Sequence, residues 1–363
     1  MNGQVGSGLN GFPDMLASFL RNTAFAKRLK AAARHEVAEA VRPLHKELKR
    51  LSEDVGRLHA VLRETNSRVE ESERRASLLG QAARFDDERR DVLDQLPDLL
   101  NEERVVAHVQ RAIAAAPLQS DPCDYIVVSD LLPDDVYEVM LDAIPPPAFF
   151  DQRDPVKQNI PFPLSSGPVL TSRAWTFMDE VVAGRGVLPA VLDKFRQPLE
   201  RHFEALFGPE AARNAHTLPR RGSGGRLMLR RPGYHLAPHR DPKYSFVTCL
   251  AYFAKPGDDE AHGTQLFRVE GDTEADYKQT YYPQANGQHC ELVATVPFRP
   301  NTMLAFVNAR GAHGAEIPRD APALERYSYQ FYVAPEADVF ASFIKQLPDA
   351  RRRMWQSKAV RER

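Results

Sequence analysis

The chain has 363 residues, of which 43% are hydrophobic and 27% are charged, and its formal net charge is -1. This is an ordinary globular composition, long enough for one large domain or two smaller ones. The near-neutral charge gives no support for phosphate-driven nucleic-acid binding, and no apolar run approaches the roughly 18 residues that a membrane span needs. We therefore expect neither a nucleic-acid partner nor a transmembrane segment.

The three cysteines and the N-terminus bear on the compartment. Cys123, Cys249 and Cys290 are an odd number at no metal-like spacing, so reduced thiols are the simplest interpretation. Residues 1–20 lack the basic start and long apolar core of a secretory signal. Both observations predict a cytoplasmic protein.

The first third of the chain is helical in pattern. Residues 14–34, DMLASFLRNTAFAKRLKAAAR, are amphipathic and basic. Such a stretch is usually a surface helix, and the alternative is a helix that docks on a membrane surface or a partner.

A heptad pattern follows over residues 37–62, where apolar residues alternate three and four apart. Pro43 should kink or interrupt this helix, which leaves about three heptads between Leu44 and Leu62. Val41 and Val55 at a positions, with leucine at d positions, favour a parallel coiled coil of two helices. The pattern predicts either a parallel homodimer through residues 37–62 or an amphipathic helix packed on its own domain.

From about Asp121 the pattern changes. Residues 124–133, DYIVVSDLLP, predict a strand, and Asp134 or Asp135 is expected to cap the helix that follows. Residues 175–208 predict helix on both sides of a glycine-rich break, with Gly208 at the end.

After Gly225 short β-type runs follow one another without helices between them, which predicts a sandwich or barrel. The runs are RLMLR, SFVTCLAYF, TQLFRV, CELVATVPF, TMLAFVN and RYSYQFYVA. The expected fold class is α+β, with three regions: a helical N-terminal region (1–116), a catalytic or binding domain (117–340) and a basic helical tail (341–363).

The candidate chemistry begins with His239 and Asp241, just before a buried strand. Residues two apart on an extended chain project to the same side. The His-x-acid pattern is weak by itself, because it recurs at 202–204 and 289–291. The first of these recurrences lies on a predicted helix, where such residues do not face each other.

A third ligand is available in His313, within the segment GAHGAE. Its flanking glycines allow the backbone to approach a ligand closely. Two histidines and one carboxylate with open coordination positions form the donor set of non-haem Fe(II) oxygenases. The sequence therefore predicts a metal site made of His239, Asp241 and His313.

An arginine, Arg326, opens the run RYSYQFYVA. Arg326, Ser328 and Gln330 are expected on one face of this strand, and the aromatic residues on the other. A buried arginine needs a partner, and a dicarboxylate co-substrate held by the guanidinium fork would provide one. The alternative is a structural ion pair with the regions of Glu325 or Asp338.

These motifs resemble a known family. HRD (239–241), GAHGAEIP (311–318) and ERYSYQFYV (325–333) look like the His-x-Asp…His…Arg signature of 2-oxoglutarate/Fe(II)-dependent dioxygenases, in the prolyl-4-hydroxylase-like branch. PGYHLAPH (232–239) and HGTQLF (262–267) are similar to further segments of this branch. The resemblance covers roughly residues 121–335. Where the branch often has a tyrosine ahead of the first histidine, this chain has Arg230.

The resemblance implies a double-stranded β-helix, or jelly-roll, with supporting helices. It implies Fe(II) on the three predicted ligands and 2-oxoglutarate gripped by Arg326, with Arg230 as a second candidate contact. Hydroxylation of a substrate C–H with release of succinate and CO2 would follow, with no catalytic residue beyond the metal centre. Because Asp241 is present, hydroxylation is favoured over halogenation.

The sequence leaves the substrate and one alternative open. The substrate is a small molecule, a glycan or a peptide, and the loops 255–263 and 270–288 are expected near the mouth of the site, where such loops set specificity. The alternative is a cupin-like module that binds a metal or ligand without turnover.

Overall fold

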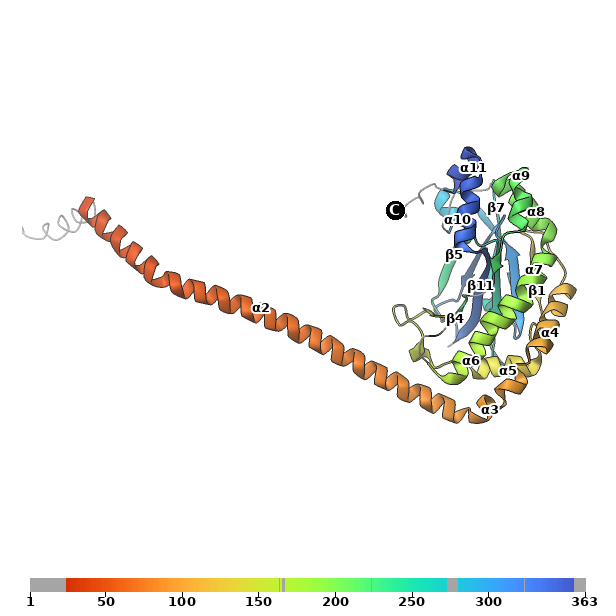
Figure 1. Ribbon diagram of the computed structural model, residues 1–363, viewed down its shortest axis with the longest axis horizontal. Coiled ribbons are helices and arrows are strands. Elements are labelled where there is room, and N and C mark those ends of the chain that lie inside the picture. Colours follow the sequence, from red (N-terminus) through yellow and green to blue (C-terminus); the bar gives the residue numbers. More distant parts are fainter. Residues whose placement is uncertain are drawn as a thin grey trace, which may run out of the picture. The chain divides into compact units, whose positions relative to one another are not determined.

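The computed structural model describes residues 24–162, 164, 167–222, 224–272, 280–322 and 324–355 (Figure 1). The chain divides into two compact units, Met1–Ala76 and Ser77–Arg363. The start of the amphipathic stretch, residues 14–23, and the end of the basic tail, residues 356–363, lie outside the described residues.

The first unit consists of most of helix α2 (Ala24–Glu88), which continues into the second unit. Of the two effects expected of Pro43, the interruption does not occur, since α2 is a single helix of 65 residues with Pro43 inside it, and a kink stays a prediction. Proline removes one backbone hydrogen bond, and the many intact turns on both sides maintain the helix. Within this unit the heptad residues Leu44, Leu48, Leu51, Val55, Leu58 and Leu62 are 48% to 67% exposed.

The second unit contains the remaining helices. They are α3 (Arg90–Leu99), α4 (Glu102–Ala115), α5 (Asp134–Asp142), α6 (Val169–Phe177), η2 (Met178–Val187), α7 (Leu188–Lys194), α8 (Arg196–Phe207), α9 (Pro209–His216), α10 (Ala337–Gln346) and α11 (Asp349–Met354). Three short 3₁₀ turns are η1 (Pro147–Phe149), η3 (Glu260–His262) and η4 (Gln284–Asn286).

Two antiparallel sheets make up the β part of this unit. The strands are β1 (Tyr125–Val128), β2 (Lys157–Pro161), β3 (Arg220–Arg221), β4 (Arg226–Arg230), β5 (His235–His239), β6 (Val247–Tyr252), β7 (Thr264–Val269), β8 (Cys290–Val296), β9 (Thr302–Val307), β10 (Ala312–Glu316) and β11 (Arg326–Pro335). The larger sheet has the order β1-β9-β6-β11-β4-β2, with β3 beside β11, and the smaller sheet has the order β5-β10-β7-β8.

The strand pairing is nested. β4 pairs with β11, β5 with β10, β6 with β9, and β7 with β8, all antiparallel. The chain therefore winds back along its own path while it alternates between the sheets, which is the double-stranded β-helix that the sequence resemblance implied.

The core has two layers because residues on a strand alternate between faces. One layer lies between the two sheets and includes Leu250, Leu266 and Phe306. The other lies between the larger sheet and the helices, with Tyr329 and Trp175 among its largest side chains. Figure 1 shows α4 to α8 along one side of the sheets.

Two local expectations need correction. α5 begins after Pro133, and neither Asp134 nor Asp135 is its N-cap. The glycine-rich stretch around Gly186 is not a break but the π-helical segment η2. A Cβ on Gly186 would lie 3.1 Å from Cγ1 of Val109, so this glycine allows η2 to pack closely on α4. Through Val105, Val109 and Ile113, α4 is part of the same core.

Candidate metal centre and co-substrate pocket

The two predicted histidine ligands lie opposite each other on neighbouring strands. His239 ends β5 and is the direct cross-strand partner of His313 on β10. His313 lies within the strand β10. The ring centroids of the two histidines are 4.1 Å apart. The antiparallel register, which no local motif reveals, brings together residues far apart in sequence.

Asp241 completes the group. Its Oδ1 lies 3.7 Å from Nε2 of His239, and its Oδ2 lies 3.6 Å from Nε2 of His313. The three ligand atoms lie within 4.8 Å of one another, and all three residues are buried. Two imidazole nitrogens and a carboxylate oxygen this close together can be ligands of a single cation.

The imidazole of His239 is held by its own strand. Its Nδ1 lies 3.0 Å from the carbonyl oxygen of Ala237. A carbonyl only accepts hydrogen bonds, so the ring carries its hydrogen on Nδ1. This leaves the Nε2 lone pair for a metal. A hydrogen bond from the other ring nitrogen to a carbonyl is the usual second contact of a metal-binding histidine.

A chain of hydrogen bonds orients Asp241. Thr248 Oγ1 donates to Asp241 Oδ2 at 2.7 Å. Asn308 Nδ2 in turn donates to Thr248 Oγ1 at 2.7 Å and to the carbonyl of Ser245 at 2.6 Å. The Tyr332 hydroxyl reaches Asp241 Oδ1 at 3.5 Å. These contacts fix the carboxylate before any metal arrives, which lowers the entropic cost of binding.

The electrostatics favour a cation. Burial, followed by the nearby His239, lowers the pKa of His313 to about 3, so this imidazole is neutral at pH 7. Burial alone would raise the pKa of Asp241, but the two histidines and the bond from Thr248 outweigh it and hold the pKa below its ordinary value. A neutral imidazole beside an ionised carboxylate is the protonation state that a divalent metal needs.

Arg326, at the start of β11, is 4% exposed and forms no ion pair with a described carboxylate. Its Nε has no hydrogen-bond partner among the described residues, and one terminal nitrogen reaches Thr264 Oγ1 only at 3.5 Å. The guanidinium lies 5.2 Å from the ring centroid of Tyr252 and 5.0 Å from that of Phe298. Burial lowers its pKa, although an arginine side chain stays protonated in proteins.

The structural ion pair considered for Arg326 is not formed with its neighbour. Glu325 points to the other side of the strand, where its Oε1 accepts a bond from Arg231 at 2.9 Å. Adjacent residues on a strand face opposite sides, so Glu325 is unable to neutralise Arg326.

Arg230 is buried, not solvated, and lies directly opposite Arg326 in the pairing of β4 with β11. Its guanidinium donates to the carbonyl of Gln158 at 2.7 Å and to Asn159 Oδ1 at 2.9 Å. A third bond goes to the carbonyl of Leu229 at 3.0 Å, so both terminal nitrogens of Arg230 already donate, while its Nε, like that of Arg326, has no partner among the described residues.

One cavity of about 180 Å³ brings these residues together. Its lining includes the three metal-ligand candidates, Arg326, Arg230, Gln330 and Tyr332. Thr280 and Tyr282 also line it, so the loop 270–288 reaches the site as expected, although residues 273–279 lie outside the described part of the chain. The other expected loop, 255–263, contributes none of the described lining residues.

The sequence reasoning missed the supporting residues Thr248, Asn308 and Tyr332. Each sits in an ordinary β-type run, and only the fold shows that it contacts Asp241 or its partner. Tyr252 is a buried core residue whose hydroxyl donates to Thr264 Oγ1 at 2.7 Å.

The fold and the site together define a double-stranded β-helix protein with a buried His-Asp-His group. No protein-family model and no curated protein sequence matches the chain. Among solved structures, HygX from Streptomyces hygroscopicus, crystallised with nickel, 2-oxoglutarate and hygromycin B, is similar at 12% identity and a TM-score of 0.35, over 59% of this chain and 83% of that one.

Two prolyl hydroxylases are also similar. The enzyme from Trichoplax adhaerens, in complex with a hypoxia inducible factor peptide fragment, has 13% identity and a TM-score of 0.34, over 68% of this chain and 96% of that one. The prolyl-4-hydroxylase from Pseudomonas putida has 16% identity and a TM-score of 0.32, over 64% and 100%. Similarity at this level carries no functional argument, which rests on the residues of the site.

Proposed function

We propose that this protein is an Fe(II)- and 2-oxoglutarate-dependent dioxygenase that hydroxylates a substrate C–H. The observation that carries the proposal is the buried group of His239, Asp241 and His313 beside an arginine without a carboxylate partner among the described residues. When bound, Fe(II) and 2-oxoglutarate supply the oxidation of the C–H by O2, with succinate and CO2 as by-products.

The roles of the chain's own residues follow from their contacts. His239, Asp241 and His313 would hold the metal, and Thr248 and Asn308 keep the carboxylate oriented. Arg326 would bind the far carboxylate of 2-oxoglutarate through its guanidinium fork. The rings of Tyr252 and Phe298 flank this arginine and exclude water from it. Arg230 would be a weaker second contact, because both of its terminal nitrogens already donate to other residues of the protein.

The cupin-like alternative is a module that binds metal without turnover. The two functions separate in one experiment, in which purified protein is incubated with Fe(II), 2-oxoglutarate and cell extract. The proposal expects succinate formation and a substrate that gains the mass of one oxygen. Bound metal with no succinate, either alone or with extract, would favour the binding module.

We also propose that two chains pair in parallel through residues 37–62. The support is a seam of exposed leucines and valines in α2, since burying such side chains against a second copy would remove them from water.

The proposal also assigns a role to each of the three regions of the chain and a cytoplasmic location to the protein. Residues 117–340 would form the catalytic part, with α4 completing its core. The rest of the helical N-terminal region 1–116 would tether two copies, and residues 341–363 would be a basic tail. In the described part of the chain no helix is long and apolar enough to cross a membrane. The three cysteines are all free and buried, which supports the proposal of a cytoplasmic location.

A further inference from the structure

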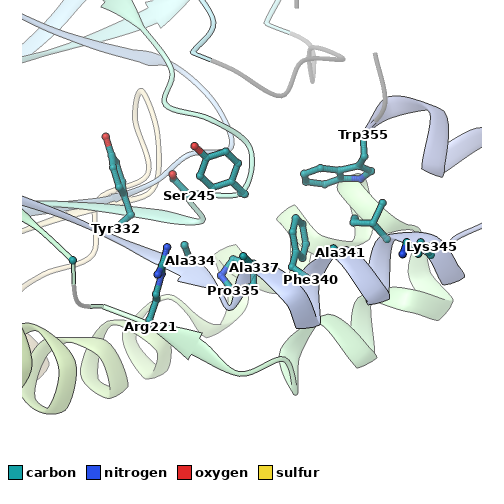
Figure 2. A pocket seen from close by; sticks show the side chains of 13 residues that line it. Arg221, Ser245, Tyr332, Ala334, Pro335, Ala337, Phe340, Ala341, Lys345 and Trp355 are labelled. Atoms are coloured by element: carbon teal, nitrogen blue, oxygen red, sulfur yellow. The ribbon is translucent and has the colours of Figure 1, made fainter. Parts of the chain in front are cut away.

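A second cavity, of about 550 Å³, lies near the far end of β11 (Figure 2). It is the size of pocket that commonly holds a small organic ligand. Phe340, Ile344 and Trp355 supply much of its apolar wall. In Figure 2, Tyr332 stands at one end of the cavity and Trp355 at the other.

This cavity adjoins the metal centre through one side chain. Tyr332 lines both cavities, and its hydroxyl lies 3.5 Å from Asp241 Oδ1. Alternate residues of β11 share a face. Along this face the lining passes from the smaller cavity to the larger one: Arg326 and Gln330 line the smaller cavity, Tyr332 lines both, and Ala334 lines the larger. Arg326 and Tyr332 are about 20 Å apart along the strand. A co-substrate on Arg326 therefore leaves the Tyr332 side of the metal centre for a substrate.

The charges around the larger cavity have one sign. Arg221 and Lys345 are among its described lining residues, and no carboxylate is. A third cation, the buried Lys243, has its ammonium 5.7 Å from the ring centroid of Trp355. Cations grouped around an apolar wall attract an anion whose body is apolar.

Two buried polar groups on the wall also lack a partner. Ser245 Oγ and Trp355 Nε1 make no hydrogen bond to any described residue. Buried donors without a partner are uncommon in native structures. Both groups can donate a hydrogen bond, so an acceptor oxygen on a ligand would satisfy them after a small side-chain rotation.

We propose that this cavity binds the substrate and that the substrate is an apolar acid, an aliphatic or aromatic body carrying one anionic group. Lys345, at the Trp355 end of the cavity, binds the anionic group, the wall of Phe340, Ile344 and Trp355 binds the body, and Arg221 adds a second positive charge at the Tyr332 end (Figure 2). This inference rests on the proposed dioxygenase function. The chain's own residues 356–363 are the competing occupant, but they carry Lys358, Arg361 and Arg363 against a single Glu362, and so repeat the charge of the cavity wall.

The test uses the emission of Trp355 in the full-length protein. The chain has two tryptophans, so Trp355→Phe identifies the part of the signal that belongs to the cavity. Decanoate, decanol and decyltrimethylammonium are titrated below their micelle-forming concentrations. We expect decanoate to change the emission saturably and to bind at least tenfold more tightly than decyltrimethylammonium.

Two variants on α10 locate the binding. Ala341 lines the cavity, and its neighbour Ser342 is exposed and does not. Ala341→Phe should abolish the decanoate signal, and Ser342→Phe should leave it unchanged. With Fe(II) and 2-oxoglutarate present, decanoate should raise succinate formation several-fold in the native chain and in Ser342→Phe, but not in Ala341→Phe.

Several results would overturn the inference. They are a Trp355 emission that does not respond to decanoate, equal affinity for decyltrimethylammonium, a succinate rate that saturating decanoate leaves unchanged, and binding that appears only after removal of residues 356–363. A calorimetric titration with 2-oxoglutarate and Mn(II) separates the two proposals. If 2-oxoglutarate binds and decanoate does not, the cavity inference fails alone. If neither 2-oxoglutarate nor Mn(II) binds, the dioxygenase function fails whatever decanoate does.

Discussion

Arg326→Met is expected to stabilise the ligand-free protein while it weakens 2-oxoglutarate binding. The guanidinium is buried and has no carboxylate partner among the described residues, so folding bears its desolvation cost, several kcal/mol for an ion. The substitution removes a bond to Thr264 at the 3.5 Å limit and two aromatic contacts, together about 0.5–2 kcal/mol. Methionine fills a similar volume. We expect a net gain in unfolding free energy of about 1–3 kcal/mol.

The effect on binding has the opposite sign. Loss of one partner of a desolvated, hydrogen-bonded charge pair costs about 2–5 kcal/mol. At about 1.4 kcal/mol per tenfold change, the Kd for 2-oxoglutarate should rise by roughly 30-fold to several thousand-fold. The metal ligands do not contact Arg326 in the structure, so metal content should be unchanged.

Urea unfolding measures both effects, with and without 2-oxoglutarate. In the native chain, ligand at 100 times its Kd should add about 2.7 kcal/mol, and in Arg326→Met at the same concentration it should add little. The matched control is Arg231→Met, since Arg231 forms a partly exposed pair with Glu325 and such pairs contribute about 0–1 kcal/mol. A destabilised Arg326→Met that still binds 2-oxoglutarate normally would show that Arg326 is a structural residue.

Three further predictions concern the metal, the pH dependence and the oligomer. Alanine at any one of the three metal-ligand candidates should abolish iron binding in metal analysis, and full occupancy in two of these variants would refute the site. Burial, followed by the charges of Lys243 and Arg240, lowers the pKa of His202 to about 3. Below pH 6.5 the unfolded chain therefore binds a proton at His202 that the folded chain does not, which lowers stability by at most about 1.4 kcal/mol per pH unit down to about pH 3. His313 has an equally low pKa and adds its own slope, so His202→Leu should reduce the slope in urea titrations between pH 6.5 and 4.5 without abolishing it. Light scattering should show a dimer for the full chain and for Lys49→Glu, but a monomer for Leu51→Glu, and a monomeric native chain would exclude the coiled coil.

Much of the β-rich part was predictable because its strands are short runs rich in apolar, β-branched and aromatic residues, separated by turn residues. β4, β6, β7, β8, β9 and β11 all begin or end within two residues of a predicted run. The two faces of β11 were also predicted correctly. Tyr327, Tyr329 and Phe331 lie in the core beneath the helices, while Arg326 and Gln330 line the cavity of the metal centre.

The strands that present the histidines were not predicted as strands. β5 reads HLAPH and β10 reads AHGAE, with proline or glycine inside and little of the β-branched and aromatic character of a strand. Their pairing comes from the nested topology, and Gly314 is needed there, because a Cβ would lie 2.7 Å from the carbonyl oxygen of Leu236. Local propensity is weakest where the backbone must approach a neighbouring strand and a ligand together. The metal triad was therefore identified by residue type and order, while its supporting hydrogen bonds required the fold.

The sequence of β11 combines two opposed requirements in one strand. Its inward face carries a charge and polar groups with few partners: Arg326 Nε and Ser328 Oγ make no hydrogen bond to described residues. Such groups reduce stability. Its outward face buries Tyr327, Tyr329 and Phe331 against the helices, and fully burying large apolar side chains contributes about 1.5–3 kcal/mol each. Because the two faces alternate, the strand can present a destabilising inward face and remain central to the sheet. Local rules fail on that inward face alone, which is the pattern expected where residues are selected for binding and not for stability.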